Sequence, residues 1–221
     1  MKVLIVGASR GIGLEFARQY RAAGDKVTAT ARSDEALAAL RSLGGNAIAL
    51  DVASAESASR LAWQIEGEAF DVVVVCAGLY GPSTSGLEPP TDAQFDAVMH
   101  TNVLGAMRVL AQLSDALAPG AKLAVLSSRM GAIGPRTSAN GWLYRASKAA
   151  LNSVLKDASL LLGGRAVCVS FHPGWVKTDM GGSGADLSAE RSVADMRRVI
   201  DELKPDDNGR FLNHDGSAIA W

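Results

Sequence analysis

The sequence predicts an α/β protein with one doubly wound domain, in which helices cover both faces of a mainly parallel sheet of about seven strands. Two observations predict this fold class. Short runs of branched apolar residues alternate with longer stretches of Ala, Leu, Arg and Glu at helical spacing, and a glycine-rich turn follows the first run. Such sheets bind ligands at the carboxyl ends of their strands. We expect residues 1–221 to form a single domain.

The first half of the chain alternates regularly between the two kinds of element. Branched apolar runs predict strands at residues 3–6, 26–31, 46–50 and 71–76. The stretches between them predict helices at residues 12–23, 34–43 and 55–66. Ser33 is the expected N-cap of the second helix, and the third helix follows Ser54. Gly24 and Gly44-Gly45 end the first two helices.

The second half continues this alternation after a loop at residues 81–90. Helices are predicted at residues 91–118, 140–162 and 188–203, and strands at residues 121–127, 165–171 and 210–213. Pro119-Gly120 is the expected end of the first of these helices, and Gly163-Gly164 the end of the second. The last helix carries an apolar stripe that indicates a buried face.

The glycine-rich turn has the spacing of a nucleotide-binding motif. The first strand leads directly into Gly7-Ala8-Ser9-Arg10-Gly11-Ile12-Gly13, and a predicted helix follows. Glycine permits a tight turn, lets the backbone approach a pyrophosphate, and lets the helix pack close to the strand. The helix amino end then offers free N–H groups to phosphates. Because the strand-turn-helix context is present, we predict dinucleotide binding here.

The same turn also fits the G-x-S-x-G pattern of serine hydrolases, with Ser9 as the nucleophile. That arrangement needs an oxyanion loop from an earlier strand. Only six residues precede Gly7, so we favour the nucleotide-binding interpretation.

The end of the second predicted strand bears on the choice of nucleotide. NAD-binding domains place an acid there to hold the ribose 2′-OH, whereas this strand ends in Thr30-Ala31-Arg32. Asp34 and Glu35 fall in the next helix, where they complement its dipole. Arg32, and Arg10 in the turn, are suited to pair with a 2′-phosphate. We therefore predict NADP(H) in preference to NAD(H).

Composition excludes several other classes. The charges nearly balance, with 22 Lys and Arg against 23 Asp and Glu, so nucleic acid is not an expected partner. Two cysteines and three histidines argue against a disulfide framework and against a metal site. The amino-terminal apolar run is too short for a signal peptide, and no run is long enough to span a membrane. We expect a cytoplasmic protein.

A Tyr–Lys pair opens the predicted helix at residues 140–162. Tyr144 and Lys148 are four residues apart and share a helix face. A tyrosine pKa near 10 must fall for proton exchange at neutral pH, and a neighbouring ammonium is expected to lower it. Ser127-Ser128 ends the preceding strand, and Asn102 interrupts an apolar stretch. A buried Asn there would hold a water or bend its helix, and a solvent-facing Asn is the alternative.

These motifs together resemble the short-chain dehydrogenase/reductase family over essentially the whole chain. The resemblance rests on residues 7–13, Asp51, Cys76-Ala77-Gly78, Asn102, Ser128, Tyr144, Lys148 and Pro173-Gly174. Residues 144–152 (YRASKAALN), residues 172–182 (HPGWVKTDMGG) and the ending from Asp215 to Trp221 are similar to the branch that contains C-factor-like signalling proteins and Sniffer-type carbonyl reductases.

The resemblance implies roles at the matching positions. Tyr144 would be the general acid in carbonyl reduction, Lys148 would lower its pKa and bind the nicotinamide ribose, and Ser128 would hold the substrate oxygen. Asn102 would support a water in a relay to Lys148. The cofactor-binding residues would be Gly7, Ser9, Arg10, Gly11, Ile12, Gly13, Arg32, Asp51, Val52, Ala77, Gly78, Asn102, Tyr144, Lys148, Pro173, Gly174, Val176 and Thr178.

The chain departs from the family pattern at several points. Cys76 stands where many relatives have Asn, and we expect it to be a buried apolar residue. Val6 replaces the usual threonine before the first glycine. The interval from Ser128 to Tyr144 is longer than usual, which suggests a tight loop at residues 136–141 and leaves Ser127 as an alternative to Ser128.

Substrate contacts are expected from Tyr80, Met130, Trp142 and Trp175, which together suggest an apolar pocket for an aldehyde or ketone. Ordinary core packing is the alternative for each of them. His172 is expected to be structural, and glycines at residues 181–184 suggest a lid.

Two functions remain in competition. The first is an NADPH-dependent carbonyl reductase or alcohol dehydrogenase that acts on a small molecule. The second is a C-factor-like signalling protein that binds NADP(H) and turns over little. The helices at residues 91–118 and 140–162 resemble the pair that forms a dimer bundle in this family, so a homodimer is expected, with a tetramer as the alternative.

Overall fold

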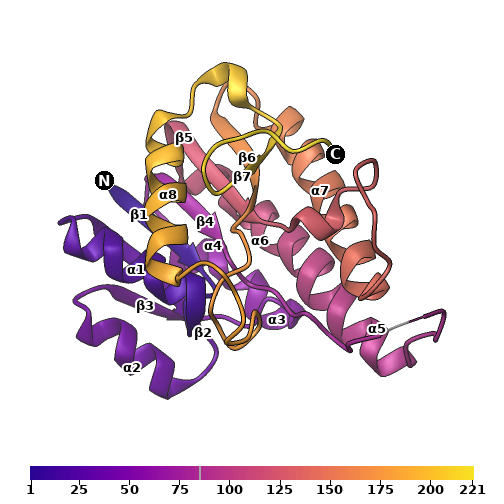
Figure 1. Cartoon of the computed structure of the whole chain (residues 1–221). Coiled ribbons are helices and arrows are strands. Elements are labelled where there is room, and N and C mark those ends of the chain that lie inside the picture. Colours follow the sequence, from indigo (N-terminus) through magenta and orange to yellow (C-terminus); the bar gives the residue numbers. More distant parts are fainter. Residues whose placement is uncertain (85) are drawn as a thin grey trace.

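The computed structural model describes residues 1–84 and 86–221, and their strands form a parallel sheet in the order β3-β2-β1-β4-β5-β6-β7 (Figure 1). The strands are β1 (Lys2–Val6), β2 (Lys26–Ala31), β3 (Asn46–Ala49), β4 (Phe70–Val75), β5 (Leu117–Leu126), β6 (Ala166–His172) and β7 (Arg210–Asn213). Every neighbouring pair runs in parallel, so the predicted doubly wound Rossmann-type fold is confirmed.

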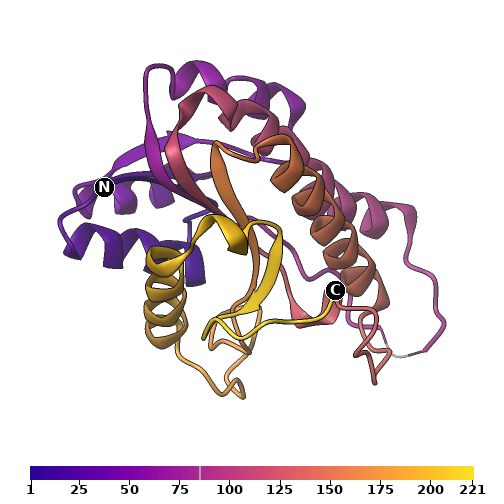
Figure 2. The same cartoon turned by 90° about the horizontal axis from the view of Figure 1, so that it is seen from above.

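Helices cover both faces of this sheet. The helices are α1 (Gly11–Ala22), α2 (Asp34–Ser42), α3 (Ala55–Ser59), α4 (Leu61–Gln64), α5 (Asp92–Met99), α6 (Gly105–Leu113), α7 (Trp142–Leu161) and α8 (Ala189–Glu202). Short turns of other helical types are η1 (His100–Leu104), η2 (Ser114–Ala116), η3 (Arg129–Gly131) and η4 (Pro205–Asp207). Figure 2 shows α1 and α8 together on one side of the sheet, with α6 and α7 on the other.

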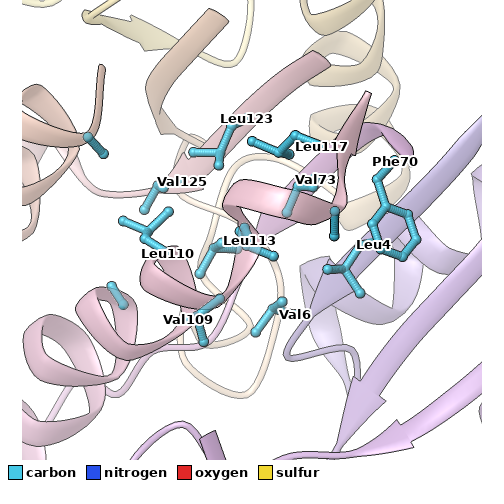
Figure 3. Packing of buried hydrophobic residues seen from close by; sticks show 14 of the residues in the cluster. Leu4, Val6, Phe70, Val73, Val109, Leu110, Leu113, Leu117, Leu123 and Val125 are labelled. Atoms are coloured by element: carbon cyan, nitrogen blue, oxygen red, sulfur yellow. The ribbon is translucent and has the colours of Figure 1, made fainter. Parts of the chain in front are cut away.

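Alternation along the strands divides the core into two layers. In β1, Leu4 and Val6 face α6 and α7, whereas Val3 and Ile5 face α1 and α8. Figure 3 shows the first layer, in which side chains of β1, β4 and β5 pack against α6. Because the strands are buried on both faces, they read in the sequence as continuous apolar runs. The two layers hold the strands in place, and the candidate functional side chains lie at the carboxyl ends of these strands.

The expected helix at residues 91–118 is wrong as one continuous element. The structure divides it into α5, a π-helical turn η1, α6 and the 3₁₀ turn η2, and β5 begins at Leu117. Thr91 caps α5 in a capping box with Gln94. The π turn contains Asn102, whose side chain bonds elsewhere in the fold. An extra residue per turn is tolerated there because these tertiary bonds stabilise it.

Pro119-Gly120 does not end a helix but lies within β5. The pairing register of β4 with β5 shifts between Phe70 and Val72, where the extra residues of β5 bulge. Gly120 has a φ of +75° and donates to the carbonyl of Arg165. A helix stop and a strand bulge share the same Pro-Gly signal, and only the neighbouring strands distinguish them.

Other boundaries differ less. The expected helix at residues 55–66 breaks at Arg60 into α3 and α4. The helix expected from residue 140 begins at Trp142. Ser33, Ser54 and Ser188 each cap a helix through a side-chain hydrogen bond. Part of the loop expected at residues 81–90 falls on residue 85, which is outside the described residues.

Candidate active site

The glycine-rich turn lies between the carboxyl ends of β1 and β4. Gly7 has a φ of +86°, and a Cβ atom there would lie 2.7 Å from the backbone nitrogen of Ala77. A Cβ on Gly13 would lie 2.1 Å from the carbonyl oxygen of Gly7. The backbone N–H of Gly7 donates to Thr30 Oγ1 at 3.0 Å. Both glycines are therefore required by close approach of the backbone, as the motif predicts.

The amino end of α1 opens from this turn. Arg10 occupies the N-cap, and within the described residues no side chain caps the helix. The first N–H groups of α1 thus remain free to donate to an anion, and the helix dipole favours one. This cradle fits the pyrophosphate of a dinucleotide.

The loop after β6 meets the turn from the other side. A Cβ on Gly11 would lie 3.3 Å from Thr178 Cγ2. Thr178 Oγ1 donates to the carbonyl of Val176 and accepts from the N–H of Gly181, which shapes the loop that follows. Arg10 forms an exposed ion pair with Asp179, with 3.1 Å between Nη1 and Oδ2. The structure therefore brings Arg10 to a carboxylate of this loop.

Arg32 and Asp51 follow the ends of β2 and β3. Arg32 is exposed, while Ser33 caps α2 and Asp34 lies in its first turn. Asp51 Oδ1 accepts from the N–H of Ala53 at 3.0 Å. Val52 is buried, and a Cβ on Gly105 would lie 2.9 Å from its Cγ2. The acids after β2 thus serve the helix, and Arg32 is the group that remains at the strand end.

Asn102 is fully buried and ties three segments together. Its Oδ1 accepts from the N–H of Leu79 at 2.7 Å, and its Nδ2 donates to the Leu79 carbonyl at 2.8 Å. The same Nδ2 donates to Ser147 Oγ at 2.9 Å, and Ser147 in turn donates to the carbonyl of Tyr144. The loop after β4 is thereby fixed to the first turn of α7. Asn102 is therefore buried within the π turn, and its amide bonds to Leu79 and Ser147 rather than to the backbone of its own helix.

Tyr144 and Lys148 lie on the buried face of α7. Lys148 is 4% exposed, and its Nζ donates to the carbonyl of Leu126 at the end of β5. Nζ lies 5.6 Å from the centre of the Tyr144 ring. A Cβ on Gly78 would lie 3.4 Å from Lys148 Nζ and 3.5 Å from Asn102 Oδ1. The pair, Asn102 and the end of β4 are therefore brought together as the motif predicts.

Burial moves the two pKa values in opposite directions. The pKa of Tyr144 is raised to about 12, mainly by desolvation, while the Ser128 hydroxyl acts to lower it and Tyr80 to raise it. Desolvation also lowers the pKa of Lys148 to about 8. The net pKa of Tyr144 is therefore raised, because desolvation is the largest of the effects on it. At pH 7 Tyr144 is a protonated phenol.

The two serines at the end of β5 take different positions. Ser127 is buried, and its hydroxyl donates to the carbonyl of Lys148 at 3.5 Å. Ser128 caps η3 by accepting from the N–H of Met130. Hydrogen bonding between the Ser128 and Tyr144 side chains acts to lower the pKa of Tyr144. Of the two alternatives, Ser128 is the one that lies beside the Tyr144 hydroxyl.

Aromatic and thioether groups lie against Tyr144. The rings of Tyr80 and Tyr144 are 4.7 Å apart between centres. A Cβ on Gly141 would lie 2.9 Å from the Tyr80 hydroxyl and 3.3 Å from Met130 Cε, so these groups meet at the start of α7. Trp142 is half-buried there, whereas Trp175 is 55% exposed and its indole N–H donates to the Gly181 carbonyl. Tyr80 and Met130 thus adjoin the Tyr–Lys pair, while Trp175 braces the loop at residues 175–181.

The inserted loop before α7 is held by a buried arginine. Arg145 Nε donates to the Asn140 carbonyl at 2.8 Å, and Nη2 donates to Ser138 Oγ and Asn140 Oδ1. The tight loop expected at residues 136–141 is therefore present and tied to α7.

Sequence reasoning missed three supporting groups. Thr30 orders Gly7, Ser147 joins Asn102 to α7, and the Leu126 carbonyl anchors Lys148. A polar residue inside a buried strand was the available signal for Thr30. Backbone acceptors such as the Leu126 carbonyl leave no mark in a sequence.

The described cavities lie away from the Tyr–Lys pair. Cavities of about 360 and 340 Å³ lie at the amino ends of the strands, near Lys122 and Lys26, on the edge opposite the Tyr–Lys pair. In residues 1–84 and 86–221, no group of three His, Cys, Asp or Glu is placed to hold a metal. None of the described helices has the length and hydropathy needed to cross a bilayer.

A family model described as short chain dehydrogenase matches residues 1–187. The C-signal protein of Myxococcus xanthus is 43% identical over 123 residues, which cover 54% of this chain and 74% of that protein.

Two carbonyl reductases of known structure superpose on the whole chain. One is from Pseudomonas aeruginosa PAO1 in complex with NADP, with a TM-score of 0.87 and 32% identity. The other is Sniffer of D. melanogaster, with a TM-score of 0.86 and 29% identity. Each alignment covers 100% of this chain and 99% of the other chain.

Proposed function

The chain belongs to the short-chain dehydrogenase/reductase family of oxidoreductases, and on that premise we propose that it transfers a hydride between NADP(H) and a carbonyl or alcohol substrate. Aldehydes, ketones and quinones are the proposed substrate class. The observation that carries the proposal is the convergence of Tyr144, Lys148 and Ser128 at one sheet edge beside the glycine turn.

The residues present fit a nicotinamide dinucleotide. Its pyrophosphate would lie on the turn from Gly7 to Gly13, where any Cβ on Gly13 would fill the cradle. Its nicotinamide ribose would lie near Lys148, whose Nζ adjoins Gly78. Arg32 would pair with a 2′-phosphate at the end of β2, where the strand offers no acid to a ribose 2′-OH. The bound cofactor supplies or accepts the hydride.

The side chains of this protein handle the proton. In carbonyl reduction, the Tyr144 hydroxyl donates a hydrogen bond and then its proton to the substrate oxygen. The Ser128 hydroxyl orients the same oxygen, and both donors stabilise the charge that develops there. The Lys148 ammonium lies close enough to stabilise the phenolate that remains. Burial raises the pKa of Tyr144 to about 12, so the hydroxyl is protonated at neutral pH and can act as the donor.

An activity screen tests the proposal. Wild type is incubated with NADPH and a panel of aldehydes, ketones and quinones, and loss of NADPH absorbance is measured. Tyr144→Phe is expected to lower kcat by at least about a hundredfold, because it removes only the proton donor. It should bind NADPH as wild type does, which fluorescence titration would establish. Wild-type turnover no greater than that of Tyr144→Phe, with NADPH binding intact, would refute the proposed enzymatic activity.

The likeness to a C-signal protein favours one alternative function. Here the chain would bind NADP(H) as part of a signalling role and turn over little. The two functions differ in the same screen, because the alternative expects NADPH binding without Tyr144-dependent turnover of any carbonyl compound.

A further inference from the structure

Three strand ends meet beside Ser128 and form an edge that the proposed proton transfer does not use. β6 lies between β5 and β7, and His172 at its end pairs in register with Asn213. Arg129 follows Ser128 after β5, yet its Nη2 donates to Asn213 Oδ1 at 3.0 Å. The Arg129 side chain therefore reaches across the carboxyl end of β6, close to His172.

Arg129 has no ion-pair partner among the described residues, and Asp215, two residues after Asn213, is bonded to Ser217. Asp195, on the adjacent helix α8, is already bonded to Arg191 and His214. Arg129 is exposed, and its bond to an amide oxygen uses only one of its five donors.

His172 adds a buried polar group to this edge. Its Nδ1 is buried and has no hydrogen-bond partner among the described residues. The pKa of His172 is lowered to about 4, mainly by burial, with Arg129 and His214 acting in the same direction. A neutral His172 beside Arg129 supplies one more polar ring atom to the same edge.

We propose that Arg129, His172 and Asn213 form a subsite that binds a carboxylate of the substrate. The inference rests on the proposed carbonyl reduction, for which Ser128 and Tyr144 hold the carbonyl end. Two strand spacings separate β5 from β7, so the acid group lies within roughly 10 Å of the carbonyl. The planar guanidinium matches a carboxylate through paired N–H donors, and Asn213 holds it in place. The preferred substrates are thus oxo acids in which a short spacer separates the two groups.

Two matched aldehydes test the subsite. 4-Carboxybenzaldehyde carries the acid, and methyl 4-formylbenzoate is its uncharged counterpart. With NADPH, wild type is expected to show a kcat/KM about tenfold higher for the acid. Arg129→Gln should lower kcat/KM for the acid about tenfold, mainly through KM, and change the ester less than twofold. Arg129→Lys should recover part of the loss, because it restores the charge without the planar fork.

Controls separate binding from structure. Arg41→Gln removes an exposed arginine on α2 and should leave both substrates unchanged. Equal losses for acid and ester in Arg129→Gln would show that Arg129 is only structural and would overturn the subsite. No wild-type preference for the acid would overturn it as well.

The subsite can also be tested without turnover. If wild type reduces neither aldehyde nor any other carbonyl compound, the proposed reductase fails, and terephthalate is then titrated calorimetrically into wild type and Arg129→Gln. Saturable binding that is weakened at least about tenfold in Arg129→Gln supports the subsite. Binding that is absent from wild type, or equal in both, overturns it.

Discussion

Individual side chains at the sheet edge owe their chemistry to burial. Tyr144 and Lys148 were paired in the sequence by spacing alone, but the structure sets their protonation. Desolvation raises the pKa of the tyrosine to about 12 and lowers that of the lysine to about 8. Both shifts favour the neutral form, because burial removes each charged group from water. The spacing identifies the pair, and burial determines what the pair can do.

Arg32 gives a prediction about cofactor choice. Arg32→Ala is expected to weaken NADPH binding about tenfold and leave NADH binding within twofold, because only NADPH carries a 2′-phosphate for the guanidinium. Fluorescence titration with both cofactors measures the ratio. Arg10→Ala is the comparison, since Arg10 already forms an ion pair with Asp179. A wild-type preference for NADH, or an unchanged ratio in Arg32→Ala, would contradict the assignment.

His172 predicts acid sensitivity. Its pKa is about 4 in the fold against an ordinary 6.5, so the unfolded state binds more protons between these values. The contribution of the neutral ring to the free energy of unfolding is fully present above pH 6.5. It decreases as the pH falls toward 4, by up to about 3 kcal/mol. Urea unfolding at pH 7 and pH 4.5 measures the loss. His172→Gln should lose less than wild type over this interval.

The exposed His100 supplies the control for that experiment. His100→Gln should lose as much stability as wild type between the two pH values. If His172→Gln lost as much as well, burial of His172 would not be the source of the acid sensitivity.

Among the elements, the π turn η1 shows how tertiary bonds override local pattern. Helical periodicity continues through residues 91–118, so the sequence predicts one helix there. The structure inserts a π turn at Asn102 because the amide satisfies both backbone groups of Leu79 and reaches Ser147. A polar residue within an apolar stretch predicts a local irregularity at this position. It does not reveal which partners lie across the fold.

Removing that amide gives the prediction at this scale. Asn102→Leu leaves the N–H and carbonyl of Leu79 without their partner, and should lower the free energy of unfolding by about 2–4 kcal/mol. Asn102→Asp keeps the acceptor for the Leu79 N–H and should lose less. Urea unfolding of wild type and the two variants measures these losses. Equal losses in both variants would mean that the Leu79 clamp is not the cause.

The candidate active site and the largest exposed apolar side chains of the helices lie on different surfaces of the molecule. The carboxyl edge of the sheet carries the glycine turn, the Tyr–Lys pair and Arg129, as expected for parallel strands. Large apolar side chains lie exposed elsewhere, with Phe95 on α5 and Met107 on α6 each 48% exposed. We propose that a second copy of the chain covers this surface and forms a homodimer through α5, α6 and α7.

Light scattering coupled to gel filtration checks the dimer. Wild type should elute with twice the 23.0 kDa chain mass. Met107→Glu places a charge in the proposed interface and should give monomers. Trp63→Glu on α4 changes an equally apolar exposed position outside the interface and should leave the dimer intact. A monomeric wild type, or a Met107→Glu protein that stays dimeric, would refute this surface.

The sequence by itself determined the order of strands and helices, the glycine turn and the Tyr–Lys pair. These follow from local periodicity, steric demands on glycine and spacing within one helix, all of which are written along the chain. Only the tertiary structure decided that Pro119-Gly120 is a bulge in β5, that burial governs Tyr144 and Lys148, and that Arg129 reaches Asn213. The reason is physical: strand pairing, desolvation and contacts between strand ends join residues far apart in sequence, and no local pattern encodes their distance.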